Sequence, residues 1–87
     1  MLYRKKPIIV EAVQWKGTQE SFLEILEQFG GTGIGMYHDS EVLDIILRVD
    51  TLEGTMQAGK DDWIIKGVAG ELYPCKPHIF EATYEAV

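Results

Sequence analysis

The chain has 87 residues, 46% of them hydrophobic, and its 14 acidic residues outweigh 8 basic ones to give a net charge of −6. Such a length predicts one domain, residues 1–87, which buries only about 60–65% of the surface that the unfolded chain exposes, so association with copies of itself would add stability. The acidic balance excludes long nucleic acid as a favoured partner, because phosphate neutralisation dominates that kind of binding.

The single cysteine, Cys75, leaves no partner for a disulfide within the chain. No apolar stretch after Met1 has the form of a signal peptide, and no uninterrupted apolar run approaches the ~18 residues of a membrane-spanning helix. We therefore expect a protein of the reducing cytosol with no membrane partner.

The first predicted element is a strand over residues 7–15. Ile8, Val10 and Ala12 fall on one face of this strand, and the opposite face is also mostly apolar. That pattern suits a central strand, or a strand covered by a helix on one side and by a neighbouring subunit on the other. Pro7 has no N–H to give to a strand ladder, so it should mark the start.

A helix is predicted over residues 19–29, where apolar side chains recur with the spacing of one helical face. Thr18 is the expected N-cap, Glu20 lies in the first turn where the helix dipole favours a carboxylate, and Gly30 with Gly31 should end the helix. The stripe expected to face the core consists of Phe22, Ile25, Leu26 and Phe29.

The glycine-rich stretch GGTGIG at residues 30–35 is not interpreted as a phosphate-binding loop. It follows a helix, whereas such loops follow a strand and open a helix, and no Gly-Lys-Ser/Thr closes it. We expect a flexible connection that leads into residues 36–38.

From Val42 onward, short apolar stretches alternate with turns. The strands predicted there are residues 44–52, 55–58, 62–66 and 71–74. Turns at this spacing indicate an antiparallel meander that curls into a small barrel or half-barrel, with the helix over one opening or face. Pro77 should begin a short C-terminal helical turn through Phe80. The predicted fold class is therefore α+β.

Residue types used in catalysis are present without a catalytic arrangement. Cys75 has two candidate histidines, His38 and His78, so a Cys–His pair stays open, but a buried structural thiol is the preferred interpretation. One cysteine and two isolated histidines fall short of a metal-ligand set. Asp61 and Asp62 are neighbours whose side chains point in opposite directions. We predict no enzyme activity, no metal and no cofactor.

Both ends of the chain resemble a family of short phage and prophage proteins. The stretches that carry the resemblance are YRKKPIIVEAVQW at residues 3–15, TLEG at 51–54, DWIIKGV at 62–68, GELYPCKP at 70–77 and IFEATY at 79–84. The chain is also similar to the anti-CBASS sponge family, whose members are oligomers that sequester the cyclic nucleotide signals of bacterial immunity.

This resemblance implies a phage anti-defence protein of the host bacterial cytoplasm. Its ligand would be a cyclic dinucleotide, a cyclic trinucleotide or a cyclic ADP-ribose isomer, bound without cleavage. Because one domain of 87 residues can scarcely enclose such a ligand, we expect a homo-oligomer, a dimer or tetramer, with the pocket between subunits.

The residues expected to bind this ligand are Tyr3, Arg4, Lys6, Trp63, Tyr73 and Lys76, with Trp15 as a weaker candidate. Arg4 and Lys6 would meet phosphates, Trp63 or Tyr73 would stack on a base, and Lys76 would close the pocket. This arrangement requires the first strand to pair within the C-terminal meander, so that both ends of the chain meet.

Two other interpretations stay open. An adaptor module would dock an exposed strand edge or apolar face onto a host enzyme or a virion component, and its basic start would protect an edge strand. A small hydrolase would use Cys75 as its nucleophile, although the sequence offers no oriented base for it.

Overall fold

The fold is described from a computed structural model, which describes residues 1–41 and 44–87, so the expected start of the strand pattern at Val42 lies outside the described residues. The elements of the described residues are β1 (Glu11–Gln14), α1 (Gln19–Phe29), β2 (Ile34–Asp39), β3 (Asp44–Thr51), β4 (Gly54–Ala58), β5 (Trp63–Lys66), β6 (Leu72–Cys75) and α2 (Pro77–Thr83). Neither helix is long and apolar enough to cross a bilayer, a finding that concerns the described residues alone.

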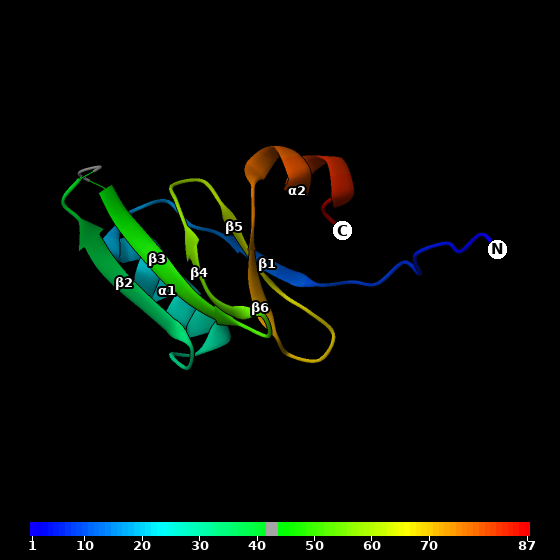
Figure 1. The fold of residues 1–87 in the computed structure, drawn as a ribbon, viewed down its shortest axis with the longest axis horizontal. Coiled ribbons are helices and arrows are strands. Elements are labelled where there is room, and N and C mark those ends of the chain that lie inside the picture. The colour runs from blue at the N-terminus through cyan, green and yellow to red at the C-terminus, as the bar shows by residue number, and fades with distance from the viewer. Residues whose placement is uncertain (42–43) are drawn as a thin grey trace.

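The strands form two antiparallel sheets of three strands each, ordered β1-β5-β6 and β2-β3-β4 (Figure 1). The predicted α+β fold is confirmed. So is the pairing of the first strand within the C-terminal strands, because β1 lies antiparallel to β5. The C-terminal helix is longer than the predicted turn, since α2 runs to Thr83.

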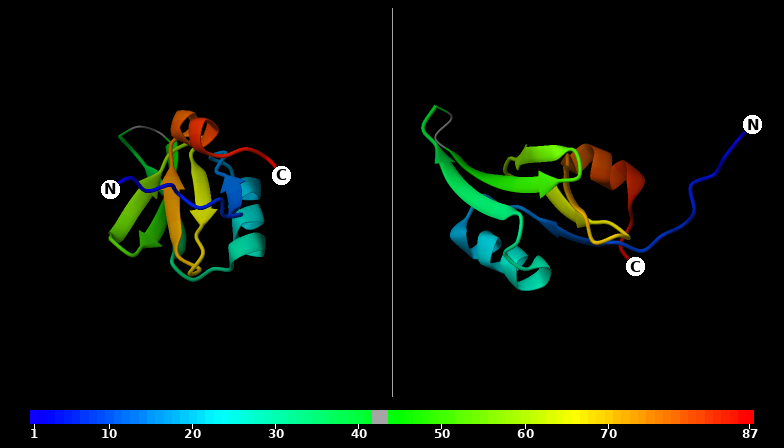
Figure 2. Two further views of the ribbon diagram at one scale, coloured as in Figure 1. Left: turned by 90° about the vertical axis from the view of Figure 1, so that its right-hand side faces the viewer. Right: turned by 60° about the horizontal axis from the view of Figure 1, so that its bottom comes forward.

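The first strand is shorter than predicted and lies at a sheet edge. β1 spans only Glu11–Gln14, and the pair at its N-terminal end joins Glu11 to Lys66. Because β5 ends at Lys66, the residues before Glu11 have no strand to pair with. Residues 1–10, the N-terminal arm, therefore continue without regular secondary structure, and residues 1–9 are exposed. The arm leads away from the body of the molecule (Figures 1 and 2).

Helix α1 has the predicted bounds and the predicted caps. The Ser21 N–H donates to Thr18 Oγ1 over 3.1 Å, which satisfies one of the free N–H groups of the first turn. At the other end Gly30 adopts a φ of 82°, a conformation that favours glycine. The cap residues alone were sufficient to predict both ends.

Replacing Thr18 with alanine is expected to lower the free energy of unfolding by about 1 kcal/mol, because the Ser21 N–H then loses its partner. Chemical denaturation followed by circular dichroism measures this change. Thr18→Ser, which keeps the accepting oxygen, is the control and should stay close to the unmodified chain. Equal losses in both variants would contradict the capping role.

Strand β2 was missed by the sequence prediction, which placed a flexible connection at residues 30–35 that leads into residues 36–38. Every residue of β2 pairs with β3; Tyr37, for example, lies opposite Ile46. The chain turns back through Gly33 at a φ of 77°, and the Asp50 N–H donates to the Gly33 carbonyl over 2.8 Å. Its partner β3 is the next strand along the chain, and the prediction missed β2 because the glycine-rich stretch at 30–35 was interpreted as a flexible connection.

One hydrophobic core joins both sheets and α1. Its buried members are Val13, Trp15, Ile25, Ile34, Leu47, Val49, Ala58, Ile64 and Leu72. The stripe predicted for α1 packs here, with Ile25 fully buried and Phe22, Leu26 and Phe29 partly so. The two sheets thus share a core.

The face of the β1-β5-β6 sheet that points away from this core is covered by α2. Side chains alternate along a strand, so Ile64 faces the core while Trp63 and Ile65 face α2. Phe80 of α2 stacks on Trp63 with ring centroids 4.1 Å apart, and Ile65 is fully buried. Figure 2 shows α2 beside β5 and β6.

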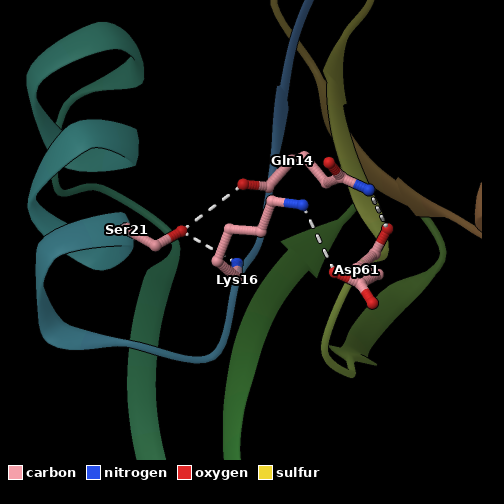
Figure 3. A network of polar contacts seen from close by, with 4 residues as sticks. All are labelled: Gln14, Lys16, Ser21 and Asp61. Atoms are coloured by element: carbon pink, nitrogen blue, oxygen red, sulfur yellow. Dashed lines mark hydrogen bonds and ion pairs between the residues drawn. The ribbon is translucent and has the colours of Figure 1, made fainter.

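A polar network joins the end of β1 to α1 and to the turn before β5 (Figure 3). The Ser21 hydroxyl accepts from the Lys16 N–H over 2.9 Å and donates to the Gln14 carbonyl over 3.4 Å. Gln14 Nε2 donates to the Asp61 carbonyl over 3.0 Å, and Lys16 Nζ lies 3.4 Å from Asp61 Oδ1. Ser21 therefore bonds to the backbone along the outer edge of β1, the edge that faces away from β5, at Gln14 and Lys16.

Candidate ligand-binding site

A groove of about 390 Å³ lies between the N-terminal arm, the turn after β5 and the last turn of α2. We call it the arm–helix groove. The lining residues that matter for ligand chemistry are Lys5, Lys6, Gly67, Glu71, Tyr73 and Tyr84. Two lysines from the start of the chain thus meet two tyrosines from its end.

Aromatic rings form a stack that ends at this groove. Trp63 stacks on Phe80 with planes 7° apart, and Phe80 stacks on Tyr84 with centroids 5.1 Å apart. The ammonium group of Lys5 lies 5.7 Å from the centroid of the Tyr84 ring, within the range of a cation–π contact. Tyr84 is therefore the ring of the stack that faces the arm, and the side chain of Lys5, an exposed residue, lies over it.

The two tyrosines of the groove also share a hydrogen bond. Their hydroxyl oxygens are 3.3 Å apart, and either can be the donor. Burial, followed by the hydrogen bond to Tyr84, raises the pKa of Tyr73 from 10.0 to about 12. The Tyr73 hydroxyl is therefore protonated at neutral pH and remains a hydrogen-bond donor or acceptor for a bound ligand.

Replacing Tyr84 with phenylalanine is expected to lower the pKa of Tyr73 from about 12 while leaving it above 10.0, because burial is the larger cause. An ultraviolet titration of tyrosinate absorbance measures this. Since the folded pKa is the raised one, the stability that Tyr73 contributes is complete below pH 10.0 and is lost as the pH rises towards about 12. Tyr37→Phe, an exposed position on β2, is the control. A Tyr73 pKa that stays at about 12 in Tyr84→Phe would show that the hydrogen bond to Tyr84 does not raise it.

A second cavity of about 660 Å³ lies against the same part of the arm. It is lined by Pro7, Ile8, Ile9, Trp63, Phe80 and the residues after α2, among others, so its walls are largely apolar. Pro7, Ile8 and Val10 border both cavities, which places this part of the arm between them.

The structure brings some of the predicted ligand-binding residues together. Lys6 and Tyr73 line the arm–helix groove, and Trp63 lines the second cavity, where Phe80 covers one face of its ring. Tyr3 and Arg4 lie further out on the exposed arm and line neither cavity; Tyr3 is 88% exposed.

Two predicted site residues lie elsewhere. Trp15 is fully buried in the core, so its ring is not available for stacking on a ligand. Lys76 lies at the end of β6 remote from the groove, where its ammonium group is 3.0 Å from Asp62 Oδ2, so it pairs with a carboxylate and does not close the groove. The sequence shows that Trp15 has a ring and that Lys76 carries a charge. It does not show that the fold buries Trp15 in the core and places Lys76 beside Asp62.

Four of the six named groove residues were absent from the predicted site: Lys5, Gly67, Glu71 and Tyr84. Tyr84 is four residues after Phe80, a helical spacing that puts both rings on one face and could have indicated the stack. Lys5 differs from Lys6 only by lying over the Tyr84 ring, which depends on how the arm leaves β1. No signal in the sequence distinguishes the two lysines.

The thiol of Cys75 is not activated. Burial, and after it the nearby Asp62 carboxylate, raises the pKa of Cys75, which keeps the thiol protonated. Cys75 Sγ lies 3.7 Å from the Lys76 carbonyl oxygen. His38 lies in the other sheet, and His78 is exposed on α2. Within residues 1–41 and 44–87, no group of three histidine, cysteine or acidic side chains is arranged to hold a metal ion.

The groove combines two cations, the Tyr84 ring over which Lys5 lies, two phenolic hydroxyls and the carboxylate of Glu71 on one concave surface. The cations, the ring and the hydroxyls suit the binding of a small anion that carries a flat ring, and Glu71 can accept a hydrogen bond from such a ligand. Comparisons with protein-family models, with curated proteins and with solved structures each found no match for this chain.

Proposed function

We propose that this chain binds a cyclic nucleotide in the arm–helix groove and holds it without cleaving it. Such an activity is that of a phage anti-defence protein that sequesters an immune signal in the cytoplasm of the host bacterium. The observation that carries the proposal is the convergence of Lys5 and Lys6 with Tyr73 and Tyr84 around one cavity of about 390 Å³.

Each part of a nucleotide has a matching group in the groove. The lysines can contact phosphate oxygens with charge-assisted hydrogen bonds of about 1.5–3 kcal/mol each. A base that takes the place of Lys5 over the Tyr84 ring would add roughly 1–3 kcal/mol by stacking. The hydroxyl of Tyr73, protonated at neutral pH, can bond a phosphate or a base edge.

The size of the groove bears on how much of the ligand it holds. Ligand pockets usually measure about 300–1,000 Å³. At about 390 Å³, with an open side towards solvent, the groove has room for one part of a cyclic dinucleotide. A second groove from another copy would be needed to enclose the rest, which agrees with the expected homo-oligomer.

Isothermal titration calorimetry against a panel of cyclic dinucleotides, cyclic trinucleotides and cyclic ADP-ribose isomers tests the proposal. At least one ligand should bind, and Lys5→Glu should weaken that binding about tenfold or more, because a favourable charge becomes a repulsive one. Lys60→Glu is the matched control, since it makes the same charge change at an exposed turn remote from the groove. The bound ligand should be recovered unchanged by chromatography.

An adaptor that docks on a host enzyme or a virion component is the second candidate. The observation that favours it is the exposed apolar side chains of the arm; Leu2 is 100% and Ile9 79% exposed. The calorimetry separates the two candidates, because an adaptor gives no heat with any nucleotide of the panel. Equal affinities in Lys5→Glu and Lys60→Glu would place a bound ligand outside the groove and contradict the first proposal.

A further inference from the structure

The outer edge of β1 is only partly used within the chain. The Trp15 N–H points towards β5 and donates to the Asp62 carbonyl over 2.8 Å, so the odd-numbered residues of β1 bond to β5. The even-numbered residues point the other way. At Gln14 and Lys16 those outward groups are bonded to Ser21. Within residues 1–41 and 44–87, no group bonds to the outward N–H and C=O of Ala12.

The same edge continues into the arm. Val10 and Ile8 lie two and four residues before Ala12, and in an extended chain their backbone groups point to the same edge as those of Ala12. Ile8, Val10 and Ala12 all line the second cavity, as does Ile9. Ile8 is 49% exposed although it is apolar. An unpaired edge of this kind is a template for another strand.

The chain exposes more surface than its mass predicts. Its accessible surface is 6502 Å². A folded monomer of 9.8 kDa is expected to expose about 5,200 Å². Its radius of gyration is 13.7 Å, against about 12 Å expected for this length. The excess of roughly 1,300 Å² exceeds the ~800 Å² that each partner contributes to a standard interface.

Charge divides sharply between the arm and the rest of the chain. The first ten residues hold three of the eight basic residues and none of the fourteen acidic ones, so they carry +3 while the other 77 residues carry −9. Helix α1, which lies at the outer edge of β1 through Ser21, contains Glu20, Glu24 and Glu27 and no basic residue. An arm that runs past another copy's α1 would therefore be attracted to it.

We propose that two copies of this chain pair through these edges, antiparallel and related by a twofold axis at Val10. Val10 then lies opposite Val10 of the second copy, and Ile8 lies opposite Ala12. Each of these pairs exchanges two backbone hydrogen bonds. The two sheets become one of six strands, in the order β6-β5-β1-β1-β5-β6. Ser21 fixes where pairing stops, because it occupies the edge from Gln14 onward.

The pairing has a consequence for the arm–helix groove, and this consequence rests on the proposed function. A twofold axis perpendicular to the joined sheet keeps the α2-covered faces of both copies on the same side. The two grooves, each bordered by residues 5–8 and by Val10, then flank the axis, and a ligand with two phosphates can meet lysines from both copies.

Cysteine cross-linking tests the register. In a Cys75→Ser background, Val10→Cys should form an intermolecular disulfide under mild oxidation, because residues opposite each other in a hydrogen-bonded pair have Cα atoms about 5.5 Å apart, within disulfide range. Ile9→Cys is the matched control and should not cross-link at a comparable rate, since Ile9 lies opposite Glu11 of the second copy. Equal rates for both variants, or none for Val10→Cys, would overturn the proposed register.

Native mass spectrometry without nucleotide tests the dimer itself. The unmodified chain should appear at twice 9.8 kDa. Val10→Pro removes the N–H at the axis and should give the monomer mass, whereas Val10→Thr keeps the N–H and the branched shape and should remain dimeric. Circular dichroism shows whether Val10→Pro is folded. A monomer mass for the unmodified chain at every concentration would refute the pairing, and because no ligand is present, that result is independent of nucleotide binding.

Discussion

Trp15→Ala is expected to lower the free energy of unfolding by about 3–5 kcal/mol, the range for truncating a large buried aromatic side chain. The Trp15 side chain is fully buried and packs in the core that joins the two sheets. A chain of 87 residues has a total stability of roughly 4–13 kcal/mol, so this loss leaves a marginal fold or none. Urea denaturation followed by circular dichroism measures the change.

Trp15→Phe is the control for this prediction. It keeps an aromatic ring in the core and removes the indole Nε1, which is buried and has no hydrogen-bond partner within the part of the chain that the structure describes. Its cost should therefore be well below that of alanine. A loss below about 1 kcal/mol for Trp15→Ala would contradict the core position and reopen Trp15 as a ligand-facing residue.

Asp62→Ala is expected to lower the free energy of unfolding by about 2–3 kcal/mol. The Asp62 carboxylate is only 5% exposed and accepts from the Gly59 N–H over 2.9 Å and from Lys76 Nζ over 3.0 Å. Most of the loss comes from the Gly59 N–H, which keeps no partner, because the Lys76 side chain is 61% exposed and regains water.

The neighbouring residue provides a matched control. The Asp61 side chain is 49% exposed and pairs with an exposed Lys16, so Asp61→Asn should cost less than about 1 kcal/mol. Asparagine also tolerates the φ of 74° at this position. Thermal and urea unfolding of both variants give the comparison. Similar losses for Asp61→Asn and Asp62→Ala would show that burial of the Asp62 carboxylate is not what stabilises this turn.

Local signals in the sequence predicted the elements that depend on local contacts. Thr18 and Gly30 bound α1 through contacts within a few residues, and both ends agree with the structure. The turn glycines likewise gave β4, β5 and β6 to within one residue at each end. Capping and turn chemistry act over short distances along the chain, so the sequence displays them directly.

Elements that depend on distant partners were predicted less well. β1 stops at Glu11 because its partner β5, which lies far along the chain, ends at Lys66. The same holds for the candidate site. Lys76 is a surface cation in the sequence, but the fold puts it beside Asp62, and Tyr84 enters the groove only because α2 folds back over β6. Such contacts follow from tertiary packing; the spacing of Phe80 and Tyr84 indicates which rings share a helix face, but not what that face packs against.

Nitrogen-15 nuclear magnetic resonance during titration with a cyclic dinucleotide tests most directly whether the ends of the chain form the binding site. The largest amide shifts are expected at Lys5, Lys6, Tyr73 and Tyr84, with little change around Lys76 at the far end of β6. Saturable shifts confined to those four residues and their neighbours would support the groove as the site. Shifts centred on Lys76 and Asp62, or none with any cyclic nucleotide, would contradict it.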